Sequence, residues 1–332
     1  MKGLLRKYIS VAWVVFLIFS ESNLFCQQLP HFTQFSLNPY LFNPALAGTE
    51  DFIHLQANIR SQWTGFKGAP QSAFLSGHTT LNKETIGYGT NKKFARERWR
   101  SIGGIVMLDK TGPISQSGAY GTFAYNLPLS SKGHRFSFGA NAGLKSFSYN
   151  PDGFLASLSN INDPVIQTAY STMVFDIDFG FWVYSRKFFI GASAFHLLNN
   201  DVKNSNIVMS TTQSSSSLAR HFFAMAGYKI DVHKDLFIVP SVLVKQVQSM
   251  QPAYDINLKA VYIQDYWVGV AYRSNDSFST FLGLLINKKL EVSYSYDLLV
   301  SSIRESSIGS NEILIGYRFS HKPKTICPDK FW

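Results

Sequence analysis

Two aspartates, Asp176 and Asp178, are the residues whose spacing could best support acid–base chemistry. They lie two positions apart in a stretch of alternating character, so in a strand both carboxyl groups would face the same side. Such a pair could act as a general acid and a general base. No nucleophile pattern accompanies them, and the wall of a hydrated barrel lumen would carry the same carboxylates. We therefore favour a lumen wall over an active site.

Motifs for metal binding, phosphate binding and covalent catalysis are absent from the sequence. It contains no Gly-rich phosphate loop ending in Lys-Ser/Thr, no His-Glu-x-x-His, no paired Cys-x-x-Cys and no Gly-x-Ser-x-Gly. His321 and Cys327 could in principle ligate a metal, but two ligands without further partners rarely form a site. The sequence thus predicts no enzyme activity, no cofactor and no metal.

Residues 1–26 have the features of a secretory signal peptide. Three basic residues precede an apolar run from Tyr8 to Phe19, which is shorter than the roughly 20 residues of a membrane-spanning helix. We expect cleavage between Cys26 and Gln27. Lipidation of Cys26 is the alternative, although the small residues that usually precede a lipidated cysteine are missing. The mature chain then keeps one cysteine, Cys327, which excludes an internal disulfide.

The composition fits an exported protein in contact with lipid. Aromatic residues make up 15% of the chain and charged residues only 16%, an unusual pairing for a soluble domain. The formal net charge is +10. A basic balance can indicate nucleic acid, but an exported chain rarely meets it, so we expect contact with anionic headgroups or lipopolysaccharide instead.

Alternation with a period of two residues recurs along the chain after the signal peptide. Apolar residues at odd positions of 53–59 face polar ones at even positions, and 136–144, 175–183 and 290–298 alternate in the same way. Weaker alternation covers 71–81, 100–110, 114–127, 187–197, 219–231, 235–247, 252–262, 265–274, 277–286 and 310–320. This predicts about fourteen strands of roughly ten residues, which is the length that a tilted strand needs to cross a bilayer. No apolar run is long enough for a spanning helix.

The connections between these strands also fit an outer-membrane β-barrel. With the N-terminus in the periplasm, the long connections 149–171, 198–218 and 299–309 all fall on the outer side, as expected for such barrels. The connection 82–99, with its basic run, falls on the periplasmic side; either the strand count slips there or this is a contact site.

A soluble β-sandwich or propeller is the alternative fold, but its strands are usually shorter. Aromatics near the strand ends resemble the girdles of a membrane barrel and favour the barrel; they are Trp99, Tyr125, Tyr149, Tyr266 and Trp267.

Two motifs near the N-terminus are the most specific features of the sequence. NPYLFNPALAG occupies residues 38–48, and RSQWTGFKGAP occupies residues 60–70. The two Asn-Pro pairs of the first motif start turns, because Asn caps locally and Pro fixes φ and cannot continue a ladder. The first motif is therefore expected to be a folded periplasmic lead, packed against or into the barrel mouth. The second should form the outer end of the first strand and its turn.

These motifs resemble the opening of the PorP/SprF family, outer-membrane proteins of the type IX secretion and gliding-motility system of Bacteroidetes. Further fragments resemble the family in the same order: MLDKTGPIS from residue 107, WVGVAYR from 267, GSNEILIGYRF from 309 and the Cys-Pro tail at 327. Lys330 interrupts the family's terminal pattern. The residues that carry the resemblance have a structural or partner-contact role; they are Asn38, Pro39, Asn43, Pro44, Gly48, Arg60, Gln62, Trp63, Asp109, Gly112, Pro113, Asp297 and Glu312.

The resemblance implies an outer-membrane component that assists the secretion or surface attachment of one exported protein. Its partners would be that cargo or adhesin, recognised through the cargo's C-terminal domain, and other translocon components. A passive porin or hydrophobic-solute channel is the alternative, since a barrel of this size could enclose a lumen. The expected organisation is a signal peptide over 1–26, a periplasmic lead over 27–51, a barrel over 52–320 and a tail over 321–332.

Overall fold

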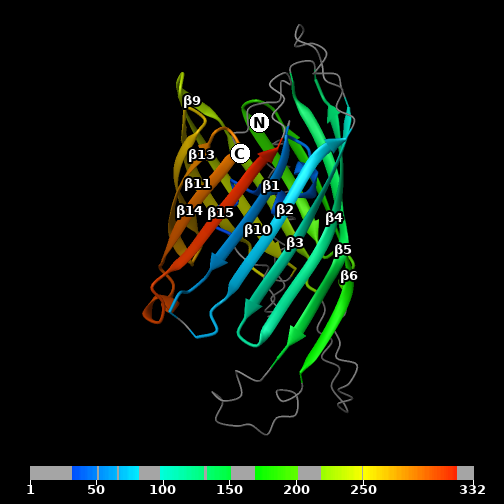
Figure 1. Cartoon of the computed structure of the whole chain (residues 1–332), viewed down its shortest axis with the longest axis vertical. Coiled ribbons are helices and arrows are strands. Elements are labelled where there is room, and N and C mark those ends of the chain that lie inside the picture. Colours follow the sequence, from blue (N-terminus) through cyan, green and yellow to red (C-terminus); the bar gives the residue numbers. More distant parts are fainter. Residues whose placement is uncertain are drawn as a thin grey trace, which may run out of the picture.

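The computed structural model describes residues 32–50, 52–65, 67–81, 98–130, 133–150, 169–200, 218–248 and 250–319 of the 332-residue chain. The signal peptide, the basic run before residue 98, His321 and Cys327 lie outside these residues. The described part is an antiparallel β-barrel with short 3-10 turns (Figure 1). None of its helices is long and apolar enough to cross a membrane.

The barrel wall consists of long, regular strands. Their bounds are β1 (Ile53–Ser61), β2 (Gln71–Leu81), β3 (Trp99–Thr111), β4 (Ile114–Pro128), β5 (Arg135–Tyr149), β6 (Tyr170–Tyr184), β7 (Phe188–Phe195), β8 (His221–Tyr228), β9 (Ile230–His233), β10 (Leu236–Val247), β11 (Ala253–Tyr262), β12 (Tyr266–Arg273), β13 (Ser277–Ile286), β14 (Leu290–Leu299) and β15 (Ser310–Phe319).

The sheet closes on itself. Each strand from β1 to β8 and from β9 to β15 pairs with its neighbour in the sequence, β8 pairs with β10, and β15 pairs with β1. β8 and β9 pair with successive stretches of the same edge of β10 and are separated by Lys229 alone, so together they form one wall strand. The fifteen described strand segments therefore make a closed barrel of fourteen wall strands. The predicted fold and strand number are confirmed.

The two faces of the wall differ as the alternation predicts. On β1 the polar side chains of His54, Gln56 and Arg60 are buried inside, whereas the apolar ones, such as Ile59, point outward and are exposed. Exposed apolar side chains on the outside of a closed barrel are typical of a surface in lipid. The interpretation of the aromatic residues is correct for Tyr266, which is exposed.

It is wrong for Trp99 and Trp267, which are buried on the inner face. Both indoles donate hydrogen bonds there, Trp99 to the carbonyl of Gly48 and Trp267 to the Ser293 hydroxyl. Buried tryptophans commonly find such partners. Their position at a strand end therefore did not reveal which face they occupy.

Residues 32–50 lie inside the barrel, behind strands β1 to β4 in Figure 1. All of these residues are buried, and two turns of 3-10 helix, η1 (Pro39–Phe42) and η2 (Pro44–Leu46), shape the segment. A proline begins each turn, which costs no hydrogen bond because the first N–H groups of a helix have no internal acceptor. The described part of the expected lead thus forms a plug, and the hydrophobic core lies between this plug and the inner wall.

Candidate functional site

Thr33, at the start of the plug, is held by charged side chains of three neighbouring strands. Its hydroxyl donates to Asp297 of β14 at 2.7 Å, and its backbone N–H donates to Glu312 of β15 at 2.8 Å. Arg60 of β1 bridges both carboxylates, at 2.5 Å from Asp297 and 3.2 Å from Glu312, and donates to the Thr33 hydroxyl at 2.8 Å. Since all four side chains are buried, the cluster depends on this mutual pairing.

The charged cluster continues along the wall. Arg273 of β12 lies 3.7 Å from Asp297 and 3.4 Å from Asp255 of β11. Lys245 of β10 completes the series at 2.8 Å from Asp255. Buried cations and carboxylates thus alternate in space, which offsets the cost of removing each charge from water. We call Arg60, Asp297, Glu312, Arg273, Asp255 and Lys245 the anchor network.

The two asparagines of the first motif bond the plug to different parts of the wall. The Asn38 amide donates to Asn58 of β1 at 2.9 Å and to Ser76 of β2 at 3.0 Å. Asn43 donates to the backbone carbonyl of Phe181 at 2.8 Å, and its side-chain oxygen accepts from Ala45 within η2. The same asparagine therefore shapes the turn and binds the wall, which explains why a short amide side chain suits this position.

Glycines of the wall allow the plug to approach closely. A Cβ atom on Gly180 of β6 would lie 2.1 Å from the Asn43 side-chain oxygen, and one on Gly139 of β5 would lie 2.6 Å from the Pro44 carbonyl oxygen. Neither position has space for a side chain while the plug is in place. Gly48, near the end of the plug, has φ +66°, and its carbonyl accepts a hydrogen bond from the Trp99 indole at 2.9 Å.

Tyr40 fixes the middle of the plug. Its hydroxyl is hydrogen-bonded to that of Thr122 on β4, and its ring packs edge-on against His78 of β2. Burial raises the pKa of Tyr40, because the phenolate would lose its hydration. The side chain therefore remains a neutral hydrogen-bonding group, and the plug is bonded to the wall along its whole described length.

The second motif builds one rim of the barrel. The turn 62–70 is closed by the Gln62 N–H, which donates to the Pro70 carbonyl at 2.9 Å. Trp63 has φ 53°, and its backbone N–H donates a hydrogen bond to the Ser310 hydroxyl. On the other side, the Gly112 N–H donates to Gly68 at 2.9 Å. Hydrogen bonds therefore tie this turn to both neighbouring connections, and we call the turns 62–70, 112–113 and 300–309 the rim.

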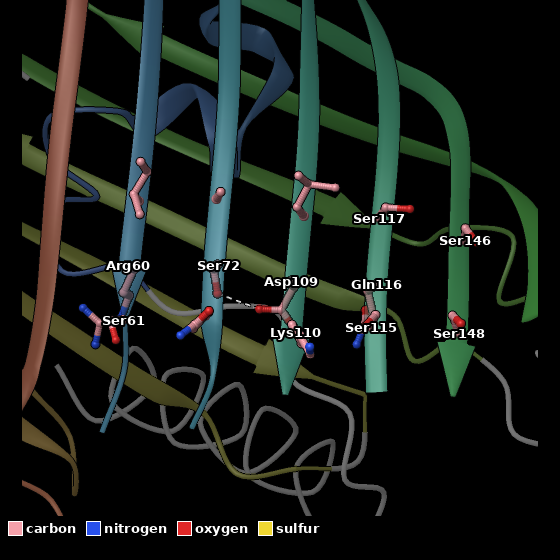
Figure 2. A pocket seen from close by; sticks show the side chains of 14 residues that line it. Arg60, Ser61, Ser72, Asp109, Lys110, Ser115, Gln116, Ser117, Ser146 and Ser148 are labelled. Atoms are coloured by element: carbon pink, nitrogen blue, oxygen red, sulfur yellow. Dashed lines mark hydrogen bonds between the residues drawn. The ribbon is translucent and has the colours of Figure 1, made fainter. Parts of the chain in front are cut away.

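Asp109 lies beside this rim, and Pro113 belongs to it. The Asp109 carboxylate accepts a hydrogen bond from Ser72 at 2.6 Å (Figure 2), and the Pro113 carbonyl accepts from Asn150 at 2.9 Å. Both contacts join neighbouring strands. They indicate a role in holding the ends of β2, β3 and β5.

Asp176 and Asp178 do face inward together, but they do not lie on a hydrated wall. Tyr120 and His196 contact the Asp176 carboxylate at 3.1 and 2.5 Å, and Asn141 donates to Asp178 at 3.1 Å. Plug residues line the small cavity beside them. The expectation of a hydrated lumen wall is therefore wrong here, because the plug fills the space that water would occupy.

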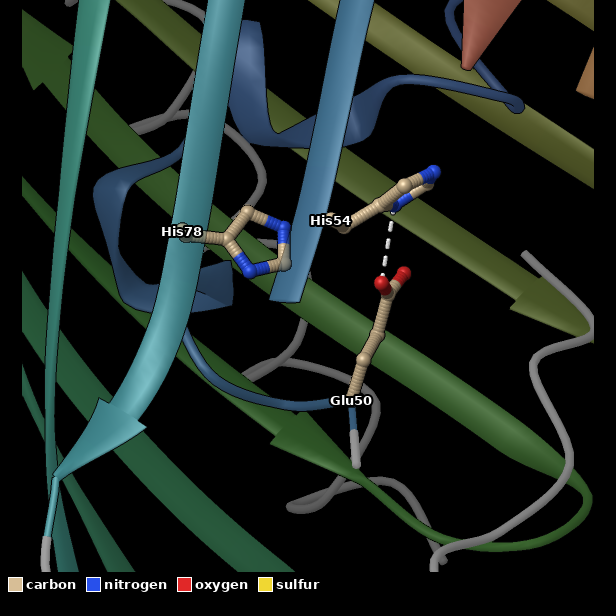
Figure 3. A group of neighbouring side chains, drawn as sticks. All are labelled: Glu50, His54 and His78. Carbon is tan, nitrogen blue, oxygen red and sulfur yellow. Dashed lines mark ion pairs between the residues drawn. The ribbon is translucent and has the colours of Figure 1, made fainter. Parts of the chain in front are cut away.

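Glu50, His54 and His78 form a second buried group, at the end of the plug (Figure 3). His54 Nδ1 lies 2.8 Å from Glu50, and its Nε2 lies 3.3 Å from Glu291 of β14. His78 accepts a hydrogen bond from the Gly48 N–H through Nδ1. The ligand atoms are close enough for a metal ion, as are those of Asp176, Asp178 and His196. In both groups, however, protein partners already account for the contacts.

The model of the family "Type IX secretion system membrane protein PorP/SprF" matches residues 24–317. The chain belongs to the PorP/SprF family. The resemblance inferred from the motifs is confirmed, and with the barrel fold it places the protein in the outer membrane. No curated protein matches the sequence.

Solved outer-membrane barrels resemble this PorP/SprF protein only distantly. The Ralstonia pickettii toluene transporter TbuX is 8% identical, with a TM-score of 0.47 over 87% of this chain and 94% of that one. A Pseudomonas aeruginosa FadL homologue is 10% identical, with a TM-score of 0.45 over 88% and 95%. Omp33 of Acinetobacter baumannii is 9% identical, with a TM-score of 0.42 over 82% and 100%.

The structure divides the family-motif residues into three groups. Asn38, Pro39, Asn43, Pro44 and Gly48 belong to the plug, whereas Gln62, Trp63, Asp109, Gly112 and Pro113 lie at or near the rim. Arg60, Asp297 and Glu312 meet in the anchor network although they are far apart in sequence.

Sequence reasoning missed Thr33, Asp255 and Lys245, and it included Arg273 only as part of the WVGVAYR fragment. A charged residue at an inward position of an alternating strand was the available signal for Asp255 and Lys245. Nothing in the sequence marked Thr33, because a threonine ahead of a turn is common.

Proposed function

We propose that this PorP/SprF protein helps one particular exported protein to cross the outer membrane or to stay attached to its surface, by protein–protein recognition. The family is a membrane component of type IX secretion, which supports a role beside other secretion components. The observation that carries the proposal is the plug. A lumen occupied by residues 32–50 suits a recognition scaffold better than an open passage.

The rim is the proposed recognition surface. Because neighbouring strands are antiparallel, the turn 62–70, the connection 300–309 and the strand ends that flank the segments 150–169 and 196–220 all lie at one end of the barrel. Outer-membrane barrels carry their longer loops outside, so this end is proposed to face the cell surface. β2 ends and β3 begins at the other end, so we propose that the basic run between them meets a periplasmic component of the translocon.

Ile308 offers a specific contact on this rim. It is 72% exposed, a large value for an isoleucine, and its backbone N–H is fixed by the Thr64 carbonyl at 3.1 Å. An apolar side chain held on a rigid turn suits an anchor for a partner. The cargo, through its C-terminal domain, is the partner that we propose for it.

The test combines a gene deletion with two matched variants. Deletion should leave one exported protein in the periplasm while the others are secreted, as measured by proteomics of the surface, medium and periplasm. Ile308→Asp should reproduce that defect. Ile263→Asp, at an exposed turn of the opposite end, should secrete normally. Normal secretion by the deletion strain, or equal defects in both variants, would contradict the proposal.

Sidedness can be measured separately in a Cys327→Ser background. Ser306→Cys on the rim should react with a membrane-impermeant maleimide on intact cells, because Ser306 is exposed. Lys234→Cys, in the short turn between β9 and β10, should react only after the outer membrane has been permeabilised. The reverse pattern would place the rim in the periplasm.

The alternative, a passive pore or hydrophobic-solute channel, has less support. Within the described residues, the apolar cavity between plug and wall measures about 40 Å³. Small-molecule sites usually measure about 300–1,000 Å³. We expect the purified full-length barrel to show little conductance in planar bilayers, and steady solute flux without partner proteins would favour the channel.

A further inference from the structure

An outward-facing groove crosses the end of the membrane-facing surface near the rim. Its cavity measures about 600 Å³ and is lined by residues of β1 to β5 (Figure 2). A second cavity of about 370 Å³, lined by the turn 62–70 and by Gly112, shares Ser61, Gln71 and Lys110 with the first. The two are therefore parts of one groove that runs from the lipid-facing band onto the rim.

The direction of the side chains places this groove on the outside of the barrel. Ile59 and Leu108, which line its membrane end, belong to the outward-facing positions and are 58% and 56% exposed. Alternate residues of a strand share one face. Ser61 lies two residues from Ile59, Lys110 lies two from Leu108, and Ser117 lies two from the exposed Ala119, so all three point outward. The inner face at this level belongs instead to Arg60 and Asp109.

The groove changes from apolar to polar along its length. Ile59, Ala73 and Leu108 lie in one cross-strand row, which Ser117 and Ser146 continue on β4 and β5. The next row toward the rim is polar throughout and consists of Ser61, Gln71, Lys110, Ser115 and Ser148. Four outward hydroxyl groups on neighbouring strands are unusual beside lipid, where alternation normally places apolar residues. They can donate and accept several hydrogen bonds to a polar group lying against the wall.

Lys110 supplies the charge at the junction of the two cavities. It is exposed and points away from its neighbour Asp109, whose carboxylate is bonded to Ser72 on the other side of the wall. Among the described lining residues, Asp109 is the sole carboxylate. The outer face of the groove therefore favours an anion, and an ammonium group binds phosphate as a point charge.

We propose that this groove binds a phosphorylated glycolipid of the surrounding membrane. The acyl chains would lie along Ile59 and Leu108, the sugar hydroxyls would meet the serines, and the phosphate would meet Lys110. Along β1, β2 and β3 the outward residues change from apolar to polar toward the rim, which matches an amphipathic lipid better than a soluble ligand. The proposal depends on the outer-membrane location and on the rim facing the cell surface, as proposed above, and it is independent of the identity of the cargo.

The experiment measures lipid retained by the full-length protein in phosphatidylcholine nanodiscs doped with bis-phosphorylated lipid A. Native mass spectrometry should detect retained lipid A on the wild type. Lys110→Ala should weaken its binding about tenfold, the usual effect of losing one charge-assisted contact. The double variant Ser117→Leu with Ser146→Leu should lose it as well. Lys289→Ala, an exposed lysine at the opposite end, should bind like the wild type.

Measurements with other ligands identify which chemical groups of the lipid the groove recognises. Dephosphorylated lipid A should bind more weakly than the phosphorylated form, and phosphatidylglycerol, which has a phosphate without the sugar, should not replace it. Inorganic phosphate should not compete. Equal retention by Lys110→Ala and wild type, or equal binding of phosphatidylglycerol, would overturn the proposal. Heat-modifiable electrophoretic mobility checks that each variant is a folded barrel. A variant with lost lipid binding and normal secretion would leave the proposed function intact.

Discussion

Arg60 and Ser61 are neighbours in sequence, yet they lie in opposite environments of the same wall. Arg60 points inward and is 2% exposed, where two carboxylates and the plug surround it. Ser61 points outward and lines the groove beside the lipid-facing band. Inside, polar groups are buried and paired with each other. Outside, polar groups lie where the apolar band ends. Polar residues therefore stabilise the fold on the inner face and form the proposed lipid site on the outer face.

The largest expected effect on stability comes from removing a charge of the anchor network on the inner face. Arg60→Leu should lower the free energy of unfolding by about 3–5 kcal/mol, because Asp297 and Glu312 would remain buried without their shared cation. A urea titration of the folded fraction measures it. Lys289→Leu, at an exposed turn, is the control. A loss below about 1 kcal/mol would mean that the anchor network is not needed for stability.

A smaller effect should follow from crowding the plug. Gly180→Ala places a methyl group 2.1 Å from the Asn43 oxygen and should cost about 1–3 kcal/mol as the plug shifts. Chymotrypsin should then cleave within residues 32–50 faster than in the wild type. Gly121→Ala on the outer face, where the nearest atom would be 3.9 Å away, provides the control. Equal cleavage of both variants would indicate that the plug does not depend on this close fit.

The smallest effects compare one substitution on the two faces. Ser293→Leu, at an inner site where the hydroxyl bonds Trp267 and the Leu282 carbonyl, should cost about 1–3 kcal/mol. Ser117→Leu, at the outer groove, should change stability by no more than about 0.5 kcal/mol. The same urea titration measures both. A large loss from Ser117→Leu would show that the outer serines stabilise the barrel rather than bind a ligand.

The wall could be predicted from the sequence because its signal is local. Alternation reports which face is apolar within each strand, so 71–81 and 277–286 coincide with β2 and β13. The plug's contacts could not be predicted in the same way. The Asn-Pro turns were visible, but the partners of Thr33 and Asn43 lie on strands far along the chain, and no local pattern encodes such pairings.

Trp99 illustrates the same limit at a single residue. An aromatic residue at a strand end fits either a membrane girdle or the inner core, and one shift in register decides between them. The hydrogen bond from its indole to Gly48 determines that it lies inside.

The pairing of β1 with β15 has a consequence for how the protein folds. The first and last strands meet, so the barrel cannot close until the entire chain is present, and closure joins the most distant parts of the sequence. Glu312, on β15, also accepts a hydrogen bond from the backbone N–H of Thr33. The last strand therefore completes both the barrel wall and the set of contacts that hold the plug.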